Sequence, residues 1–484
     1  MVAGVLQSVL GFTAAFTNLT ALFGPSLSAD AQIFLPTDIN FTSKLTQRWT
    51  DYNAPSYIGA IKPATEADIQ NIVKIAAANK IPFLTTGGGH GTDDFHAFNG
   101  LSIDLSNFRS VHLDPSENSL TIGGAAKVYQ LDKLLNDAGK EFPLGSCKCM
   151  GVVGATMGGG IGSLIGHRGL MLDALESVRV ITADGNLLEA SKNQYPDLFW
   201  AIRGAGSNFG IVTSAVYTVY DASNNGKAMN ADFVFPASAN QSFWQLMKDF
   251  DDTLPSRLAL TAVAFYDRVH NQPVIAVNAV FFGPLEEGEP HLAPLKALNP
   301  VRSNISMVSG SDLMDAAFFN FFGNDNGACT PNQHINIYTV GLKKIDPPTF
   351  ETFFANLNDF WIANPEFQGR LLLQRFPNQA VQAVPDAETA YGHREVKTYM
   401  NIEGFYANKG LDAAVNAFVK PARDEFARTS GFETLTTYSN YAHGDEGPEA
   451  WYSTRKLPQL SALKRKWDPD QLFRWNYPVP LRWP

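Results

Sequence analysis

Strands and helices alternate in the hydrophobic pattern of the first part of the chain. Residues 58–61 are expected to form a strand, and Thr65 is expected to cap a helix that has Asp68 at its third position. The apolar residues that follow recur at helical spacing, which gives this helix one buried face. A second strand over 81–85 runs directly into a glycine run that contains His90. Further strands are expected over 101–105, 120–123 and 175–183, and a further helix over 127–137.

Glycine-rich loops occur at three places, over 86–91, 145–169 and 203–210. Glycine lets backbone N–H groups converge on an anion, so three such loops favour a bound dinucleotide over a set of tight turns. None of them fits the G-x-G-x-x-G pattern that follows a first strand and precedes an acidic residue by about 20 positions. A nicotinamide site of the Rossmann type is therefore not expected.

The pattern changes near Tyr220. Residues 221–226 have the composition of a linker, and alternating strands such as 274–281 and 336–342 follow beside longer helices. These strands predict an antiparallel sheet covered by helices, and hence an α+β fold with two domains. The expected parts are a first domain over 1–220, a second domain over 221–430 and a C-terminal segment over 431–484.

Composition and charge exclude several classes of function. The 484 residues are 45 % hydrophobic, and 37 basic against 47 acidic residues give a net charge of −10. No basic run forms a phosphate-binding stripe, so nucleic acid is not an expected partner. No segment has the roughly 20 apolar residues of a membrane span. The first 24 residues are uncharged, but polar side chains interrupt them and no basic residue precedes them, which favours an intracellular over a secreted protein.

The cysteines and one histidine are the first candidates for chemistry. Cys147, Cys149 and Cys329 cannot supply a disulfide framework. A metal knuckle would need four ligands and a wider spacing, so no metal site is expected. His90 lies among glycines, without neighbouring side chains to bury it, and its imidazole can therefore face a reactive ring of a bound ligand.

Five motifs follow one another in a fixed order at 86–91, 145–154, 200–210, 438–441 and 467–473. Together they closely resemble the berberine bridge enzyme-like branch of the vanillyl-alcohol oxidase type of FAD enzymes, which have a PCMH-type FAD-binding domain. The segment 385–394, which contains Thr-Ala-Tyr, is most similar to fungal members. The resemblance implies that the C-terminal segment returns to close the FAD domain and that the sheet of the middle domain covers the flavin.

The resemblance also implies covalent FAD. In this family the histidine that matches His90 is bonded to the flavin 8α-methyl group, and the cysteine that matches Cys147 can add a bond at C6, with Cys149 as the neighbouring alternative. Both bonds raise the flavin reduction potential and hold the flavin in an open site. The other FAD-binding positions implied are Thr86, Gly87, Gly88, Gly89, Gly91, Gly145, Ser146, Met150, Gly151, Gly154, Ala155, Gly158, Gly210, Ile211, Val212, Asn440 and Asn476.

Three positions depart from the family pattern. Met150 stands where oxidases usually have valine and dehydrogenases leucine, which puts rapid use of oxygen in doubt. Ala155 replaces a histidine near flavin N1, so backbone dipoles or another residue must stabilise the reduced flavin. Ile161 replaces a tyrosine and presents a more apolar wall to the substrate.

The resemblance nominates Tyr438 as the catalytic base, with Tyr441 as a weaker candidate and Asn440 as a flavin ligand. A tyrosine has a reference pKa near 10, so a nearby cation or oriented donor must lower it for work near neutral pH. The alternative for Tyr438 is a buried aromatic ring with a satisfied hydroxyl. Three other pairs of residues have ordinary structural explanations beside a functional one: His167 and Arg168 at the pyrophosphate or in solvent, His393 and Arg394 at the substrate or in an ion pair, and Asp445 and Glu446 as an acid/base pair or a solvated turn.

We therefore expect an FAD-linked oxidase or dehydrogenase that passes hydride from a small secondary metabolite to flavin N5, in some cases with ring closure. A polyketide, alkaloid or terpenoid is the expected substrate, and molecular oxygen or another acceptor takes the electrons. The alternatives are a cyclase that holds FAD without net redox change, a carbohydrate oxidase, and a flavin-binding protein without catalysis.

Overall fold

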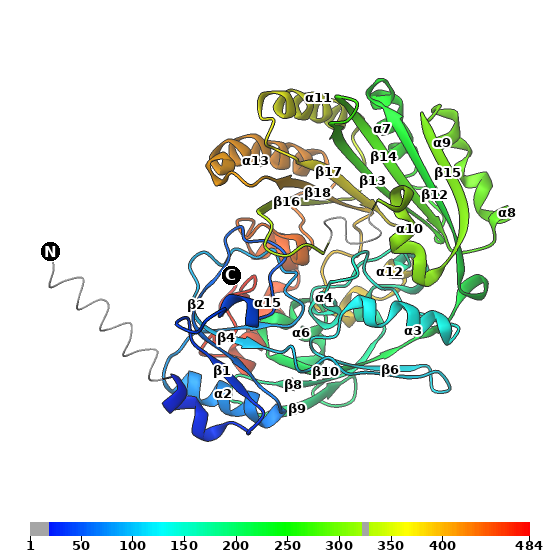
Figure 1. The fold of residues 1–484 in the computed structure, drawn as a ribbon. Coiled ribbons are helices and arrows are strands. Elements are labelled where there is room, and N and C mark those ends of the chain that lie inside the picture. The colour runs from blue at the N-terminus through cyan, green and yellow to red at the C-terminus, as the bar shows by residue number, and fades with distance from the viewer. Residues whose placement is uncertain (1–18, 322–328) are drawn as a thin grey trace, which may run out of the picture.

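The computed structural model describes residues 19–321 and 329–484. Most of the first 24 residues, whose composition favoured an intracellular protein, lie outside these ranges. Figure 1 shows two halves. The lower half combines the N-terminal part of the chain with the C-terminal segment, and the upper half is a large sheet with helices on its outer side. The cavity described below lies where the halves meet.

The first sheet of the lower half has the order β1-β2-β4-β3, with β2, β4 and β3 parallel. Helix α2 (Glu66–Ala78) connects β2 to β3 and begins as predicted. Thr65 Oγ1 accepts a hydrogen bond from the Asp68 amide, and the Asp68 carboxylate accepts one from the Thr65 amide. The strands are β1 (Gln32–Phe34), β2 (Ser56–Lys62), β3 (Phe83–Thr86) and β4 (Asn99–Asp104).

A second, antiparallel sheet has the order β5-β6-β10-β8-β9. The helix predicted over 127–137 is wrong as one unit, because Leu131 separates a 3₁₀ turn, Val128–Gln130, from α3 (Asp132–Asp137). The strands are β5 (Val111–Asp114), β6 (Ser119–Gly123), β8 (Leu175–Ile181), β9 (Leu187–Ser191) and β10 (Ile211–Thr218), with β7 (Lys140–Glu141) and β11 (Tyr220–Asp221) paired beside them. The helices are α4 (Val152–Met157), α5 (Ile165–Arg168) and α6 (Pro196–Ala205).

The upper half is built on one seven-stranded antiparallel sheet in the order β15-β12-β14-β13-β17-β18-β16. Successive side chains of a strand point to opposite faces, so each strand contributes to two surfaces. One face packs under α7, α11 and α13 in the largest hydrophobic core, and the other faces the lower half. The strands are β12 (Lys227–Pro236), β13 (Leu258–Asp267), β14 (Gln272–Phe281), β15 (Arg302–Ser309), β16 (Ile335–Leu342), β17 (Arg370–Arg375) and β18 (Thr398–Phe405). The helices are α7 (Asn240–Asp249), α8 (Leu285–Gly288), α9 (Ala293–Ala297), α10 (Leu313–Asn320), α11 (Pro347–Ala363), α12 (Gln379–Ala383) and α13 (Asp412–Thr429).

The C-terminal segment packs back into the core of the lower half through α14 (Pro448–Tyr452) and α15 (Leu457–Trp467). The fully buried Lys464 ammonium fixes this return. It donates to the Asn208 carbonyl, to the Asp468 carboxylate and to the Phe473 carbonyl. Lys464 therefore joins the motif at 200–210 to the motif at 467–473, which gives these motif residues a structural role. No helix within the described ranges has the length and apolar character that a membrane crossing requires.

Candidate functional site

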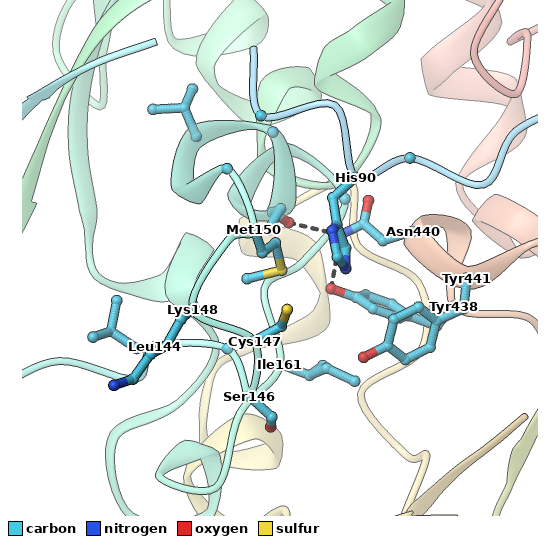
Figure 2. Close-up of a pocket in the computed structure, with 18 of the residues that line it drawn as sticks. His90, Leu144, Ser146, Cys147, Lys148, Met150, Ile161, Tyr438, Asn440 and Tyr441 are labelled. Carbon is cyan, nitrogen blue, oxygen red and sulfur yellow. Dashed lines mark hydrogen bonds between the residues drawn. The ribbon is translucent and has the colours of Figure 1, made fainter. Parts of the chain in front are cut away.

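A cavity of about 580 Å³ runs between the two halves. It is lined by His90, Cys147, Tyr438, Tyr441 and all the other FAD-binding positions that the resemblance implies, but not by the alternatives Cys149, His167 and Arg168. These residues come from the loops after β3 and β7, from the start of β10 and from the C-terminal segment. Figure 2 shows His90, Cys147, Tyr438 and Tyr441 around this space. The chain thus brings four sequence-distant stretches to one site.

The glycine loops contain glycine first of all because two segments of the chain cross there at very short distance. A Cβ on Gly88 would lie 2.4 Å from the Gly151 amide nitrogen, so neither loop tolerates a side chain at the crossing. Gly89 has φ of +75°, and a Cβ there would lie 2.3 Å from the Gln47 carbonyl oxygen. Close backbone packing leaves the His90 and Cys147 loops on adjacent walls of the cavity.

His90 is not isolated, contrary to the sequence-based expectation. Its ring stacks on the Trp49 indole with 4.5 Å between centroids and 22° between planes. Burial, together with the charge of the Lys127 ammonium, lowers the pKa of His90 to about 4. The imidazole is therefore neutral at physiological pH, with a nitrogen lone pair available for bonding.

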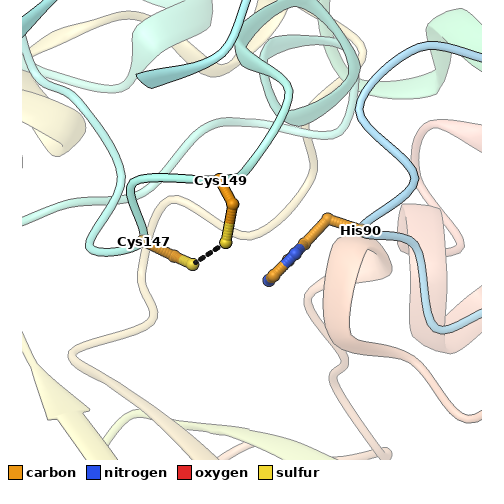
Figure 3. Close-up of side chains that lie close together, drawn as sticks. All are labelled: His90, Cys147 and Cys149. Carbon is orange, nitrogen blue, oxygen red and sulfur yellow. Dashed lines mark hydrogen bonds between the residues drawn. The ribbon is translucent and has the colours of Figure 1, made fainter. Parts of the chain in front are cut away.

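Cys147 lies close to His90. A ring nitrogen of His90 and the Cys147 sulfur are within 4.8 Å of each other, and both face the cavity. Figure 3 shows Cys147 and Cys149 beside the imidazole. Burial raises the pKa of the Cys147 thiol, although the Cys149 and Met150 amides and the Lys127 charge counteract this.

Cys149 is bonded to Cys329 in a disulfide, with 5.6 Å between the Cα atoms. We expected no disulfide framework from three cysteines, and the expectation misses this single bond because its partners are 180 residues apart. The disulfide removes Cys149 as the alternative flavin attachment. His90, Cys147 and Cys149 form a compact group that could otherwise hold a metal ion. The disulfide removes the Cys149 thiolate as one of its three ligands.

The Tyr438 hydroxyl is held by two donors. The Gly160 amide donates to it at 3.0 Å and the Asn440 side-chain amide at 2.7 Å, while Asn440 also donates to the Ala155 carbonyl at 2.8 Å (Figure 2). These are the oriented donors that the sequence could not identify. Burial nevertheless dominates and raises the pKa of Tyr438 to about 12. A base that works near neutral pH needs a lowered pKa. The protein groups around Tyr438 do not by themselves lower its pKa in this way.

Tyr441 lies beside Tyr438, with 5.0 Å between ring centroids. Its hydroxyl donates to Gln374 Oε1 at 2.9 Å. Burial raises the pKa of Tyr441 far above its usual value, and the charges of Tyr438 and Glu403 act in the same direction. Tyr441 is thus a hydrogen-bonded side chain of the cavity wall that ties the C-terminal segment to β17.

Known proteins resemble this chain over nearly its whole length. A family model for an FAD binding domain matches residues 58–191, and a model described as berberine and berberine like matches residues 437–480. The FAD-linked oxidoreductase tazG of Aspergillus terreus is 61 % identical over 482 residues, which cover 99 % of this chain and 98 % of the relative. The chain belongs to the berberine bridge enzyme-like family of FAD-linked oxidoreductases. A second relative, azaL of Aspergillus niger, is 47 % identical over 95 % of this chain and 99 % of its own length.

Solved structures share the fold of this oxidoreductase at low identity. The xylooligosaccharide oxidase of Myceliophthora thermophila, in complex with xylobiose, superposes with a TM-score of 0.80 at 21 % identity, over 97 % of this chain and 99 % of its own. The Acremonium strictum glucooligosaccharide oxidase, described as revealing a novel flavinylation, has a TM-score of 0.80 at 20 % identity, over 97 % and 98 %. The fold is therefore the predicted α+β, PCMH-type FAD-binding fold with an antiparallel substrate-side sheet.

The cavity of the oxidoreductase has the features that FAD needs. Its volume falls within the range of about 300–1,000 Å³ that is usual for ligand sites. Two buried polar atoms on its wall, Trp49 Nε1 and Asp93 Oδ1, have no hydrogen-bond partner among the described residues. Burial raises the pKa of Asp93 to about 6, although Arg48 and Asn476 oppose the shift. A ligand with both hydroxyl donors and heteroatom acceptors, as FAD has, would satisfy both atoms.

The inner face of the middle sheet forms the wall opposite the glycine loops, and none of its residues is marked by a sequence motif. Three of its polar side chains are bonded to other protein groups. The Asn278 amide donates to Asp232, Gln374 accepts from Tyr441, and Arg370 donates to Glu403. Aliphatic side chains fill much of the remaining wall: Ala259, Val263, Val280, Ile337 and Leu372.

The other charged candidates of the oxidoreductase are structural. Arg168 pairs with Glu141 at 2.6 Å, and Arg394 forms a buried pair with Asp173 at 2.7 Å. Neither of these side chains lines the cavity.

The turn that contains Asp445 and Glu446 is not simply solvated, so this expectation was wrong. Asp445 pairs with Arg423 at 2.5 Å. The Glu446 carboxylate is fully buried and accepts from the His443 amide and the Trp451 indole. Both acids therefore hold the C-terminal segment in place.

Proposed function

We propose that this enzyme holds FAD through His90, and through Cys147 as a second attachment, and oxidises a small apolar organic molecule. The observation that carries the proposal is the approach of the His90 nitrogen and the Cys147 sulfur to within 4.8 Å on one side of the cavity. Two positions on the benzenoid ring of one flavin, the 8α-methyl group and C6, can take these two bonds. The neutral His90 imidazole supports the first bond, since only an unprotonated nitrogen is a nucleophile.

FAD, when bound, supplies the acceptor for a hydride from the substrate. The protein's part is to orient the substrate and to take a proton as hydride leaves. We assign the proton to Tyr438, because its hydroxyl lines the cavity and two donors stabilise the anion that a base must form. Asn440 then has a positioning role, since it joins Tyr438 to the Ala155 carbonyl. Tyr441 is the weaker candidate, because its hydroxyl already donates a hydrogen bond to Gln374.

The cavity wall supports an apolar secondary metabolite, such as a polyketide, alkaloid or terpenoid, over a sugar. Sugar hydroxyls need many polar partners, whereas Asn278 Nδ2, Gln374 Oε1 and Arg370 Nε are already bonded within the protein. Ile161 adds a further apolar surface. Oxidative ring closure is one outcome of such a reaction. The carbohydrate oxidases that share the fold make a sugar the second candidate.

Substrate and reaction type can be tested together by mixing the enzyme anaerobically with aromatic and terpenoid metabolites and with oligosaccharides. We expect the visible flavin absorbance to bleach with an apolar metabolite. Faster bleaching by sugars would favour a carbohydrate oxidase, and product without bleaching would favour a cyclase without net redox change. Mixing the reduced enzyme with oxygen then tests whether oxygen is the acceptor.

The covalent attachment has its own test. Acid-precipitated enzyme should stay yellow, and a variant with His90→Ala and Cys147→Ala should release its FAD. Each single variant should keep the flavin through the other bond. Colour that stays with the acid-precipitated double variant would contradict the assignment.

A further inference from the structure

Three sulfur atoms lie together at the proposed second attachment. The Cys147 sulfur is 3.3 Å from the Cys149 sulfur (Figure 3). Cys149 is itself bonded to Cys329. A disulfide bond is about 2.05 Å long, so Cys147 and Cys149 could pair after a movement of about 1 Å. Cys149 therefore has two sulfurs within reach and can bond only one.

We propose that the Cys149–Cys329 disulfide protects Cys147: by occupying Cys149 it prevents a Cys147–Cys149 disulfide and keeps the Cys147 thiol available for the flavin. This inference rests on the proposed attachment at Cys147. It assigns to the disulfide a role in cofactor loading in addition to cross-linking.

The two segments that the disulfide joins are also held by other bonds. The Tyr129 amide donates to the Lys148 carbonyl at 2.9 Å, and the Lys148 ammonium pairs with Asp315 at 2.5 Å. On the other side, the Asn332 amide donates to the Arg48 carbonyl at 2.7 Å. Loss of the disulfide should therefore leave both loops near their places. This favours protection of a thiol over positioning of a loop.

The disulfide is also accessible to small thiols and disulfides. A second cavity of about 310 Å³ is lined by Cys149 and Cys329 together with His90, Lys127 and Arg109. The two cationic side chains suit an anionic tripeptide such as glutathione. Burial raises the pKa of the Cys147 thiol, and the smaller thiolate fraction slows its attack on the intact disulfide and on a mixed disulfide alike.

The competing reaction can be written for a Cys329→Ser variant with glutathione disulfide as the oxidant. The Cys149 thiolate attacks glutathione disulfide and releases one glutathione. The Cys147 thiolate then attacks the mixed disulfide at Cys149 and releases the second. The protein loses two electrons and two protons, glutathione disulfide gains them, and the new bond joins Cys147 to Cys149.

The test compares wild type, Cys329→Ser, and the double variant Cys149→Ser/Cys329→Ser, each loaded with FAD while glutathione disulfide is present, so that flavin attachment and disulfide formation compete for Cys147. Peptide mass spectrometry without reduction then reports flavin and disulfide at Cys147. We expect Cys329→Ser to form the Cys147–Cys149 disulfide and to carry about tenfold less flavin at Cys147 than wild type. The double variant should recover the wild-type flavin level at Cys147, because the competing sulfur is gone. Flavin at His90 should be equal in all three and serves as the folding control.

Unchanged flavin at Cys147 in Cys329→Ser would overturn the proposal, as would an equal loss in the double variant, which would indicate loop positioning instead. If wild type carries no flavin at Cys147, the proposed second attachment fails. The disulfide map still tests protection in that case. Protection then requires a Cys147–Cys149 bond in Cys329→Ser and a Cys147 that alkylates in wild type.

Discussion

Tyr438 illustrates how two opposing effects set the chemistry of a single residue. Hydrogen bonds from Gly160 and Asn440 favour the phenolate, but removal from water favours the neutral phenol more strongly, so the pKa is raised to about 12. At neutral pH the side chain therefore keeps its proton. Below its pKa the phenolate fraction grows about tenfold per pH unit.

The pH dependence of flavin reduction should follow from this. With Tyr438 as the base, the rate should rise with pH through the alkaline range up to the pKa in the loaded enzyme. Tyr438→Phe should keep normal FAD content, reduce its flavin on the order of 10²-fold more slowly, and lose the pH dependence. Anaerobic stopped-flow absorbance measures all three properties. An unchanged rate in the variant would dismiss Tyr438 as the base.

Met150 gives a second prediction for a single residue. Its side chain lines the cavity, and its terminal methyl group lies close to Gly145. Met150→Val should open this wall and speed reoxidation of the reduced flavin by oxygen roughly tenfold, or about 1.4 kcal/mol in the barrier. The rate of reduction by substrate should stay the same, which is the internal control. Equal reoxidation rates would place the oxygen barrier elsewhere.

Helix α2 was predictable from the sequence because its signals are local. Thr65, Asp68 and the apolar spacing that follows lie within a few turns, and the structure reproduces the capping box. The strand pattern of β16 was predictable for the same reason, but a strand does not reveal which of its faces meets a cavity. Contacts between distant segments, such as Cys149 with Cys329 and Trp49 with His90, leave no local signal. The sequence motifs were enough to locate the proposed FAD site. The sheet wall opposite that site could be identified only from the three-dimensional structure.

The start of α2 also contributes to the stability of the protein in a way that can be tested. Asp68 is buried and accepts hydrogen bonds from the Ser28 amide and hydroxyl as well as from Thr65, so it joins the N-terminal segment to the helix. Burial opposes ionisation, yet these bonds lower the Asp68 pKa overall. The stabilisation is thus present above the unfolded pKa and is lost as pH falls through the lower folded pKa.

Asp68→Ala should lower the free energy of unfolding by about 1–2 kcal/mol at neutral pH, as expected for loss of a cap. The difference from wild type should shrink as the pH falls below the carboxylate range. Urea titrations at several pH values measure it. Asp114→Ala is a suitable control, since Asp114 also accepts local hydrogen bonds but lies at the end of β5, where these bonds are exposed to water. A difference that grows in acid would contradict this explanation.

At the scale of the whole molecule, the two halves are joined by buried polar contacts as well as by apolar packing. Arg394, which precedes β18, forms two bonds to Asp173 in the lower half and a third to the Val381 carbonyl. The side chains of Arg394 and Asp173 are only 5 % and 7 % exposed. The contact lies near Tyr391, whose backbone amide bonds to the Arg203 carbonyl. The domain boundaries at 220 and 430 stay predictions, but Arg394 acts across the first of them.

Breaking this pair should therefore cost far more than breaking a surface pair. Arg394→Met leaves the Asp173 carboxylate buried without its cation and should lower stability by about 3–5 kcal/mol. Arg428 and Glu425 offer the matched control, because they bond at 2.5 Å but are 69 % and 48 % exposed, so Arg428→Met should cost about 0–1 kcal/mol. Thermal unfolding followed by circular dichroism and by flavin fluorescence gives both values. Adding Asp173→Asn to Arg394→Met should recover part of the loss, since the unpaired charge is then removed. If the double variant is no more stable than the single one, the penalty arises from packing of the arginine and the electrostatic explanation fails.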